Sequence, residues 1–237
     1  MKIQDVLKRN HLFQNLTALE LDQIAKNLIK TKYARNELII EKDEDNSNLF
    51  FILNGKVEAS MTVLYSEIRK EPKYNRKSVI DFYSMLEVIN LRSVIGQTKS
   101  ITDIRCIQNT DVVKIPSSVI ADMMNVNRQF RNAIYSELAN LNNKIITRSA
   151  ILPALNVEER IMVSIGRYSE RKIGVITMGN MTISKISELS SCSREMASRV
   201  FKKFQQNGLV IKDGREILIS EEFYEHCVKN NVLNKIQ

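Results

Sequence analysis

Three charged side chains near residue 195 have the types and spacing needed to read a base pair. Arg194 and Glu195 are adjacent, and Arg199 follows four positions after Glu195. A guanidinium can donate two parallel hydrogen bonds to O6 and N7 of guanine, and a carboxylate can accept one from N4 of cytosine. Side chains four apart on a helix share a face. The same spacing also allows an ion pair between Glu195 and Arg199 on a solvated face, and these three residues leave both interpretations open.

The surrounding sequence predicts a helix-turn-helix. Residues 183–189 have the apolar spacing of a short amphipathic helix, which Ser190-Ser191-Cys192 interrupts. Ser193 is a good N-cap for a second helix. One face of that helix is apolar and the other is polar and charged, as in a helix that enters the major groove. The apolar face consists of Ala197, Val200, Phe201 and Phe204, and the polar face carries Arg194, Glu195, Ser198 and Arg199.

Two short strands after this helix predict a hairpin, the wing of a winged helix. They are residues 209–212 and 216–219, joined through Asp213-Gly214-Arg215. Between residues 194 and 215 there are six basic and two acidic residues, a net charge of +4 against +8 for the whole chain. Such a concentration suits phosphate binding. We therefore expect a surface for double-stranded DNA that consists of Ser193, Arg194, Glu195, Ser198, Arg199, Lys202, Lys212 and Arg215.

The rest of the chain predicts an α+β protein. Thr17 and Glu20 form a capping box for a helix that continues to Ile29. Short β-branched runs between residues 37 and 115, with a hairpin signal at Asn54-Gly55, predict a small antiparallel barrel or roll. A helical stretch follows to about residue 149, and the chain beyond Pro153 is helical before its final hairpin. The predicted domains are 1–115, 116–150 and 151–237.

The helical stretch contains an apolar stripe with 4-3-4 spacing, which is typical of a coiled-coil seam. We expect the stripe to face a second copy of the chain, which would make the protein a homodimer. The alternative is a helix that packs on its own domain. The stripe consists of Ile134, Leu138, Leu141 and Ile145.

Composition excludes several classes of protein. Of the 237 residues, 43% are hydrophobic and 26% charged, which is normal for a globular domain. The three cysteines and two histidines are scattered, so we expect no disulfide, no metal and no cofactor. No apolar run is long enough to span a membrane, and we expect a cytoplasmic protein. The chain lacks a nucleophile elbow, a P-loop and paired carboxylates, so we do not expect an enzyme.

The run from Glu188 to Val210 resembles the helix-turn-helix of the Crp/Fnr (catabolite activator / fumarate-nitrate regulator) family. The resemblance covers nearly the whole chain, including residues 49–57 and 155–161. It implies a cyclic-nucleotide-binding-like β-roll, a long dimerisation helix and a C-terminal winged helix-turn-helix. It also implies a homodimer on a near-palindromic site, with RNA polymerase as a partner. Arg194, Glu195 and Arg199 then take base-contacting positions, and the half-site is T-G-T-G-A or a close variant.

The chain departs from the family where cyclic AMP would bind. The family has a Gly-Glu pair, whereas Leu86 precedes Glu87 here, and the position of its phosphate-binding arginine falls on Ser100, beside Lys99. The polar pair that meets the adenine becomes Ile145-Ile146. We expect a regulator that is independent of cyclic AMP, and the effector pocket, if present, to involve Glu87, Lys99 and Ser100. The alternatives are a displaced phosphate contact from Arg92 or Arg105, or a ligand-binding regulatory module that acts through protein contacts.

Overall fold

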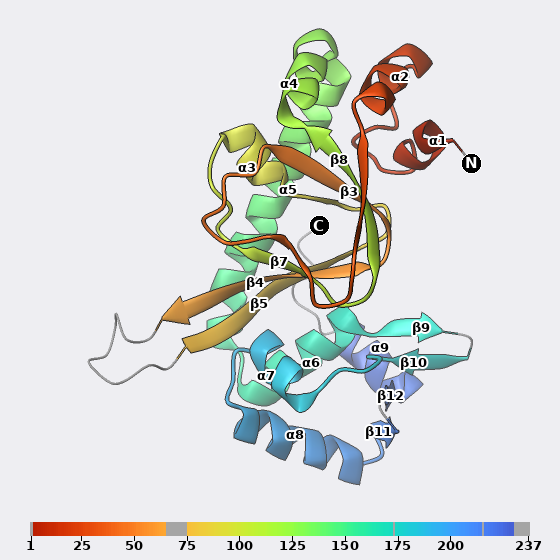
Figure 1. Ribbon diagram of the computed structural model, residues 1–237. Coiled ribbons are helices and arrows are strands. Elements are labelled where there is room, and N and C mark those ends of the chain that lie inside the picture. Colours follow the sequence, from red (N-terminus) through yellow and green to blue (C-terminus); the bar gives the residue numbers. More distant parts are fainter. Residues whose placement is uncertain (1, 65–74, 173, 215, 230–237) are drawn as a thin grey trace. The chain divides into compact units, whose positions relative to one another are not determined.

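The computed structural model divides the chain into two compact units, residues 1–141 and 142–237 (Figure 1). It describes residues 2–64, 75–172, 174–214 and 216–229. The boundary falls inside a helix, whereas the sequence suggested boundaries at 115/116 and 150/151. None of the described helices is both long and apolar enough to cross a membrane.

The first unit contains two four-stranded antiparallel sheets, which confirm the predicted roll (Figure 1). One sheet has the order β1-β8-β3-β6 and consists of Ile29–Tyr33, Thr110–Pro116, Asn48–Asn54 and Val88–Ile89. The other has the order β2-β7-β4-β5 and consists of Leu38–Ile40, Asp103–Cys106, Lys56–Leu64 and Asn75–Ser84. At the β3–β4 turn, Gly55 has φ +103°, and a Cβ there would lie 2.6 Å from the Thr110 Cα, so only glycine fits.

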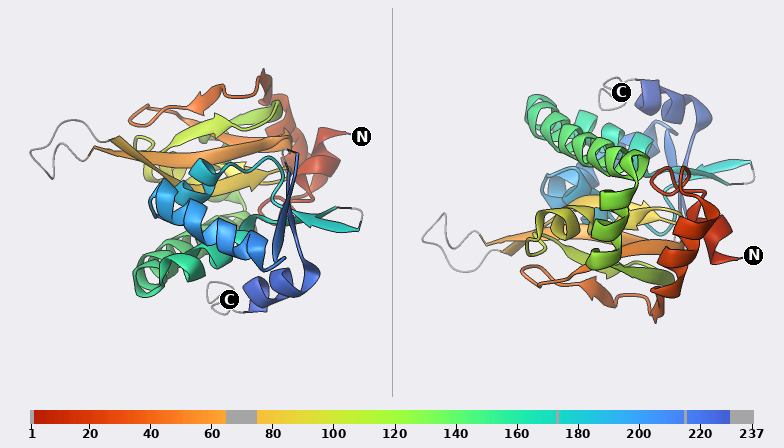
Figure 2. Two further views of the ribbon diagram at one scale, coloured as in Figure 1. Left: turned by 90° about the horizontal axis from the view of Figure 1, so that it is seen from below. Right: turned by 90° about the horizontal axis from the view of Figure 1, so that it is seen from above.

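Apolar side chains alternate between two cores. Phe50, Ile52 and Val112 point between the sheets, where residues from both sheets are buried together. Their neighbours Phe51 and Val113 point outward and are covered by helices. This alternation is the period of two that a strand imposes. The covering helices are α1 (Ile3–Leu7), α2 (Ala18–Lys26), α3 (Leu91–Gly96), α4 (Ser117–Val126) and the first part of α5 (Arg128–Ile151) (Figure 2).

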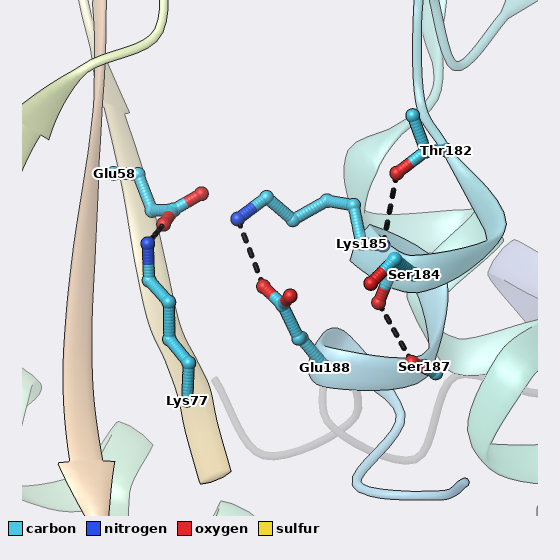
Figure 3. Close-up of polar contacts among 7 residues, drawn as sticks. All are labelled: Glu58, Lys77, Thr182, Ser184, Lys185, Ser187 and Glu188. Carbon is cyan, nitrogen blue, oxygen red and sulfur yellow. Dashed lines mark hydrogen bonds and ion pairs between the residues drawn. The ribbon is translucent and has the colours of Figure 1, made fainter. Parts of the chain in front are cut away.

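One carboxylate is buried in the second sheet. The Glu58 side chain is 1% exposed, and its Oε1 lies 2.7 Å from the Lys77 Nζ (Figure 3). Burial of a charge is costly unless a partner compensates it. The ion pair from β5 therefore permits a charged residue in the middle of β4.

The N-terminal capping box is confirmed, but the helix is shorter than predicted. The Thr17 Oγ1 accepts the Glu20 backbone N–H at 3.3 Å, and the Glu20 carboxylate accepts the Thr17 N–H at 2.8 Å. That hydrogen bond from Thr17 and one from Asn127 lower the pKa of Glu20. The helix ends at Lys26, and Ile29 opens strand β1. A β-branched side chain favours a strand, and β1 forms because it can pair with β8.

The long helical stretch is two helices, not one. Asn127 has extended backbone angles, and its Oδ1 accepts the Phe130 N–H at 2.9 Å, so it caps the second helix. Its amide also donates to Glu20 at 2.8 Å. These two bonds fix the break between α4 and α5.

The predicted dimer stripe needs a correction. Ile134 is 0% exposed and lies in the core of the first unit with Phe130. Leu138 and Leu141 are half-buried against the same core, and Ile145 is half-buried. The predicted alternative, a helix that packs on its own domain, is correct for Ile134, because a side chain fully buried in its own core cannot contact a partner.

In its described residues the second unit contains the helices α6 to α9, the end of α5 and a four-stranded antiparallel sheet of order β11-β12-β10-β9. The predicted hairpin is present as β11 (Val210–Asp213) and β12 (Glu216–Ile219). The prediction that only one hairpin follows Pro153, at the end of the chain, was wrong in two respects. A further hairpin, β9 (Glu170–Lys172) with β10 (Val175–Thr177), precedes the helix-turn-helix, and α9 (Glu221–Lys229) follows the wing. The other helices are α6 (Val157–Tyr168), α7 (Ile183–Leu189) and α8 (Arg194–Gln206), preceded by the end of α5 and a 3-10 turn at Leu152–Ala154.

Candidate DNA-binding surface

The first helix of the motif, α7, begins where its cap predicts. The Thr182 Oγ1 accepts the Lys185 backbone N–H at 3.1 Å (Figure 3). Within the helix, the Lys185 Nζ lies 3.0 Å from the Glu188 carboxylate, and the Ser187 hydroxyl donates to the Ser184 carbonyl at 2.7 Å (Figure 3). These local bonds stabilise a helix that is only two turns long.

The turn between α7 and α8 carries backbone strain. Ser191 has φ +49°, in the left-handed region that favours glycine. A serine in this region is strained, because its Cβ is crowded at positive φ. Two contacts from α6 surround the turn: Arg160 Nη1 donates to the Ser191 carbonyl at 3.1 Å, and the buried hydroxyls of Ser164 and Ser190 are 3.0 Å apart. Helix α6 therefore holds the turn in its strained conformation.

The second helix, α8, has the predicted cap and the predicted faces. The Ser193 side chain accepts the Met196 N–H at 3.2 Å. Ala197, Phe201 and Phe204 are buried, and Ser198 and Val200 are half-buried. The opposite face exposes the predicted charged residues Arg194, Glu195, Arg199 and Lys202.

The predicted alternative for these charges, an ion pair along the helix, is not formed. Among the described residues, the structure contains no ion pair between Glu195 and Arg199. The neighbouring Lys203 differs, since its Nζ lies 2.7 Å from the Glu158 carboxylate of α6. The guanidinium and carboxylate groups of the exposed face thus remain available to a ligand, whereas Lys203 is partly neutralised.

The wing places one further basic side chain in solvent. Lys212 on β11 is exposed, and Arg215 lies outside the described residues. The Leu209 N–H donates to the Phe204 carbonyl at 2.9 Å, so the wing begins directly at the end of α8. Strand and helix are thereby linked by a short turn at Gly208, which has φ +69°.

Two features that position α8 were not predicted. One is Arg160, whose spacing gave no signal beyond the resemblance of residues 155–161 to a family helix. The other is α9, whose Phe223 ring packs edge-on against the Phe204 ring with 4.9 Å between the centroids. Its Cys227 lies so close to α6 that a Cβ on Gly166 would be 3.0 Å from the Cys227 carbonyl oxygen. Burial raises the pKa of the Cys227 thiol to about 12. The acidic pair Glu221-Glu222 at its start was the available signal for α9.

The three candidate effector residues serve other roles. The Glu87 carboxylate accepts the Ser84 N–H at 2.6 Å and the Ser84 hydroxyl at 3.0 Å, in the turn between β5 and β6. The Ser100 hydroxyl donates to the Thr102 carbonyl at 2.7 Å, and Lys99 is exposed, 3.9 Å from Asp45. No described contact brings these residues together.

The two arginines that could have offered a displaced phosphate contact lie outside the interior of the roll, which is apolar. Arg92 is exposed on α3, and the Arg105 Nη1 donates to the Asn36 carbonyl at 2.7 Å. The space between the sheets is lined by buried aliphatic and aromatic side chains, and burial raises the pKa of Cys106 there. In the part of the chain that the structure describes, no three histidine, cysteine or acidic side chains are grouped as a metal would require.

Comparison with known proteins identifies the motif and the fold. Residues 181–210 match the sequence profile of the family described as bacterial regulatory proteins, crp family. No curated protein sequence matches the chain.

Solved structures match over almost their whole length. The c-di-GMP responsive global regulator CLP of Xanthomonas campestris is 16% identical, with a TM-score of 0.70 over 86% of this chain and 99% of that one. A putative transcriptional regulator of the crp/fnr family from Eubacterium rectale is 16% identical, with a TM-score of 0.68 over 93% and 98%. FixK2 from Bradyrhizobium japonicum is 16% identical, with a TM-score of 0.65 over 85% and 96%.

The chain therefore combines a cyclic-nucleotide-binding-like roll with a winged helix-turn-helix, the fold that it shares with these solved structures. Residues 181–210 match the model of the crp family, and the fold over most of the chain is similar to those of the solved regulators named above. The resemblance found in the sequence is thus confirmed at both levels.

The strained turn makes a testable prediction about stability. Replacing Ser191 by glycine should raise the free energy of unfolding by about 1 kcal/mol, because glycine adopts positive φ without steric cost. Ser191→Ala should change it by only a few tenths of a kcal/mol, since the strain remains. Chemical denaturation of the three proteins measures the difference. A Ser191→Gly protein less stable than the wild type would show that the turn is unstrained, because glycine would then contribute only its greater unfolded-state entropy.

Proposed function

We propose that the protein is a sequence-specific DNA-binding transcription regulator that acts as a homodimer without cyclic AMP. The observation that carries the proposal is the exposed face of α8. It presents Arg194, Glu195 and Arg199 from a helix whose N-terminus is capped and whose opposite face is buried. These groups match guanine and cytosine edges in the major groove. Ser193 and Ser198 lie at the same end of the helix and complete the reading surface.

Phosphate contacts supply the remaining affinity. Lys202 on the exposed face and Lys212 on the wing are exposed, and Arg215 belongs to the same predicted set. Lysine acts as a point charge toward phosphates, and its contacts position the protein without reading sequence. Such a protein works where the DNA is, in the cytoplasm, with RNA polymerase as its partner, and it requires no catalytic activity.

The dimer interface of the proposal is a revised face of α5. Because Ile134 belongs to the core, Tyr135 replaces it in the partner-facing stripe, which keeps the half-buried Leu138 and Ile145 and has Ile146 beside it. Tyr135 and Ile146 are 54% and 57% exposed, which is unusual for large apolar side chains on one helix. A two-fold dimer would place its two α8 helices about one DNA turn apart, roughly 34 Å, on a near-palindrome.

Independence from cyclic AMP is proposed because the polar side chains that could bind the nucleotide already form hydrogen bonds within the protein. A cyclic nucleotide needs its phosphate charge met by a donor such as arginine and its ribose held by a carboxylate. Glu87 caps a turn, Ser100 bonds within its own loop, and the Arg105 guanidinium bonds to Asn36. A phosphate without a partner in an apolar interior would be penalised heavily.

Base reading is tested by alanine substitution on α8. Arg199→Ala and Arg194→Ala should each lower affinity for the selected site by about 1–3 kcal/mol and relax the preference at one guanine of a T-G-T-G-A-like half-site. Lys202→Ala is the matched control. It should weaken binding to all sequences alike and reduce the salt dependence by about one phosphate contact.

Selection from a random DNA pool, followed by anisotropy titrations at several salt concentrations, measures both effects. If the arginine variants weaken all sequences equally, the arginines bind phosphates and base reading by α8 is rejected. If the wild type selects no sequence and shows no salt-dependent binding, the protein is a regulatory module that acts through protein contacts.

Dimerisation is tested at Ile146, which has no part in the core. Ile146→Asp places a charge in the proposed interface, so the protein should sediment as a monomer and bind its site far more weakly, since one half-site alone has few contacts. Asn140→Asp, an exposed position on another face of α5, is the control and should remain dimeric. An Ile146→Asp protein that stays a dimer would place the interface elsewhere.

Nucleotide independence is tested by calorimetry with cyclic AMP and cyclic GMP. We expect no heat of binding and no change in affinity for the selected DNA when either nucleotide is added. Micromolar binding of either nucleotide together with tighter DNA binding would overturn this part of the proposal. Loss of that binding in Arg92→Ala or Arg105→Ala would then identify the phosphate contact.

A further inference from the structure

One apolar side chain interrupts the charged face of α8. Met196 is 43% exposed, and in this helix, all of whose residues the structure describes, it is the one large hydrophobic side chain that is exposed. The burial of Ala197, Phe201 and Phe204 shows that α8 has a complete apolar face without it. Met196 therefore does not contribute to the core, and its side chain meets whatever the helix binds.

The backbone holds Met196 in the first turn, where a reading helix approaches base edges most closely. The Ser193 hydroxyl accepts its N–H at 3.2 Å, so the position of its Cα is fixed by the cap. It follows Glu195 directly and precedes Arg199 by three residues, which places it one turn from that guanidinium on a neighbouring part of the helix surface.

We propose that Met196 contacts the C5-methyl group of a thymine next to the guanine that Arg199 reads. The proposal rests on the DNA-binding function proposed above and adds a base to its recognition. In the major groove only thymine presents a methyl group, and apolar side chains distinguish thymine by packing on it. The unbranched, polarisable side chain of methionine adapts to such a contact.

The chemistry of the methionine side chain favours an apolar contact. A thioether is a weak acceptor and donates nothing, so Met196 cannot read the polar edges of a base pair or hold a phosphate. Glu195 and Arg199 on either side supply the polar readout. Removal of the methyl group from the thymine beside the guanine that Arg199 reads should therefore be felt through Met196.

The experiment replaces each thymine of the selected site in turn by deoxyuridine, which differs only by the missing methyl group. For the wild type, one position in each half-site should lose about fourfold in affinity, the effect of one buried methyl group. For Met196→Gln, which keeps the length of the side chain but makes it polar, the loss at that position should disappear. Met196→Leu should retain it.

Ile211→Ala is the control, because Ile211 is an exposed apolar side chain on the wing of the same unit. It should leave the deoxyuridine pattern of the wild type unchanged. The proposal is overturned if no thymine position is sensitive in the wild type, or if the sensitive position is equally sensitive in Met196→Gln. Either result can occur while Arg199→Ala still relaxes the guanine, so it is distinguishable from a failure of DNA binding itself.

Discussion

The orientation of α8 depends on the turn at Ser190–Cys192. Three bonds surround it: Arg160 to the Ser191 carbonyl, Ser164 to the Ser190 hydroxyl, and the Cys192 N–H to the Ser187 carbonyl at 3.1 Å. Both serine hydroxyls are buried, and Ser164 also bonds the Arg160 carbonyl at 3.0 Å, so loss of Ser164 would leave the Ser190 hydroxyl unsatisfied. A reading surface is useful only if its supporting contacts hold it rigidly. Here α6 provides two of the three contacts and thus sets how α8 is presented.

Helix α5 shows why an apolar stripe does not reveal its own partner. Ile134, Leu138, Leu141 and Ile145 have coiled-coil spacing, yet the same spacing suits a helix packed on a sheet. Ile134 lies in its own core, with Phe51 and Val113 from β3 and β8. The exposed Tyr135 and Ile146 were not part of the predicted stripe. The face of a helix that is left exposed for a partner is known only once it is known which of its residues the chain's own core buries.

Elements with strong local signals were predictable, and elements stabilised by distant partners were not. The N-cap at Ser193, the helix α8 and the wing turn at Gly214 can each be predicted from a pattern of only a few residues. Strand β1 and the β9–β10 hairpin are short, with exposed residues, and they exist because β8 and β12 offer hydrogen-bonding edges. The break at Asn127 likewise depends on Glu20, far away in sequence. The hydrogen bond from the Ser84 N–H to the Glu87 carboxylate could not be predicted either, because no local pattern in the sequence identifies that turn.

The arrangement of charges links the proposed dimer to DNA affinity. Lys203 is held by Glu158 and Arg171 by Glu221 and Glu225, so part of the basic charge of the second unit is neutralised within the protein. Within the described residues of the second unit, these ion pairs reduce the basic charge that is left for phosphates, and affinity for DNA falls as the number of phosphate contacts falls. Joining two copies makes the second half-site an intramolecular partner at high effective concentration. Since α5 anchors to the roll through Ile134 and would meet its partner through the adjacent face, a change in the packing of the roll would shift that face as well. Under the proposed function, control of DNA binding would therefore act through the roll without a nucleotide inside it.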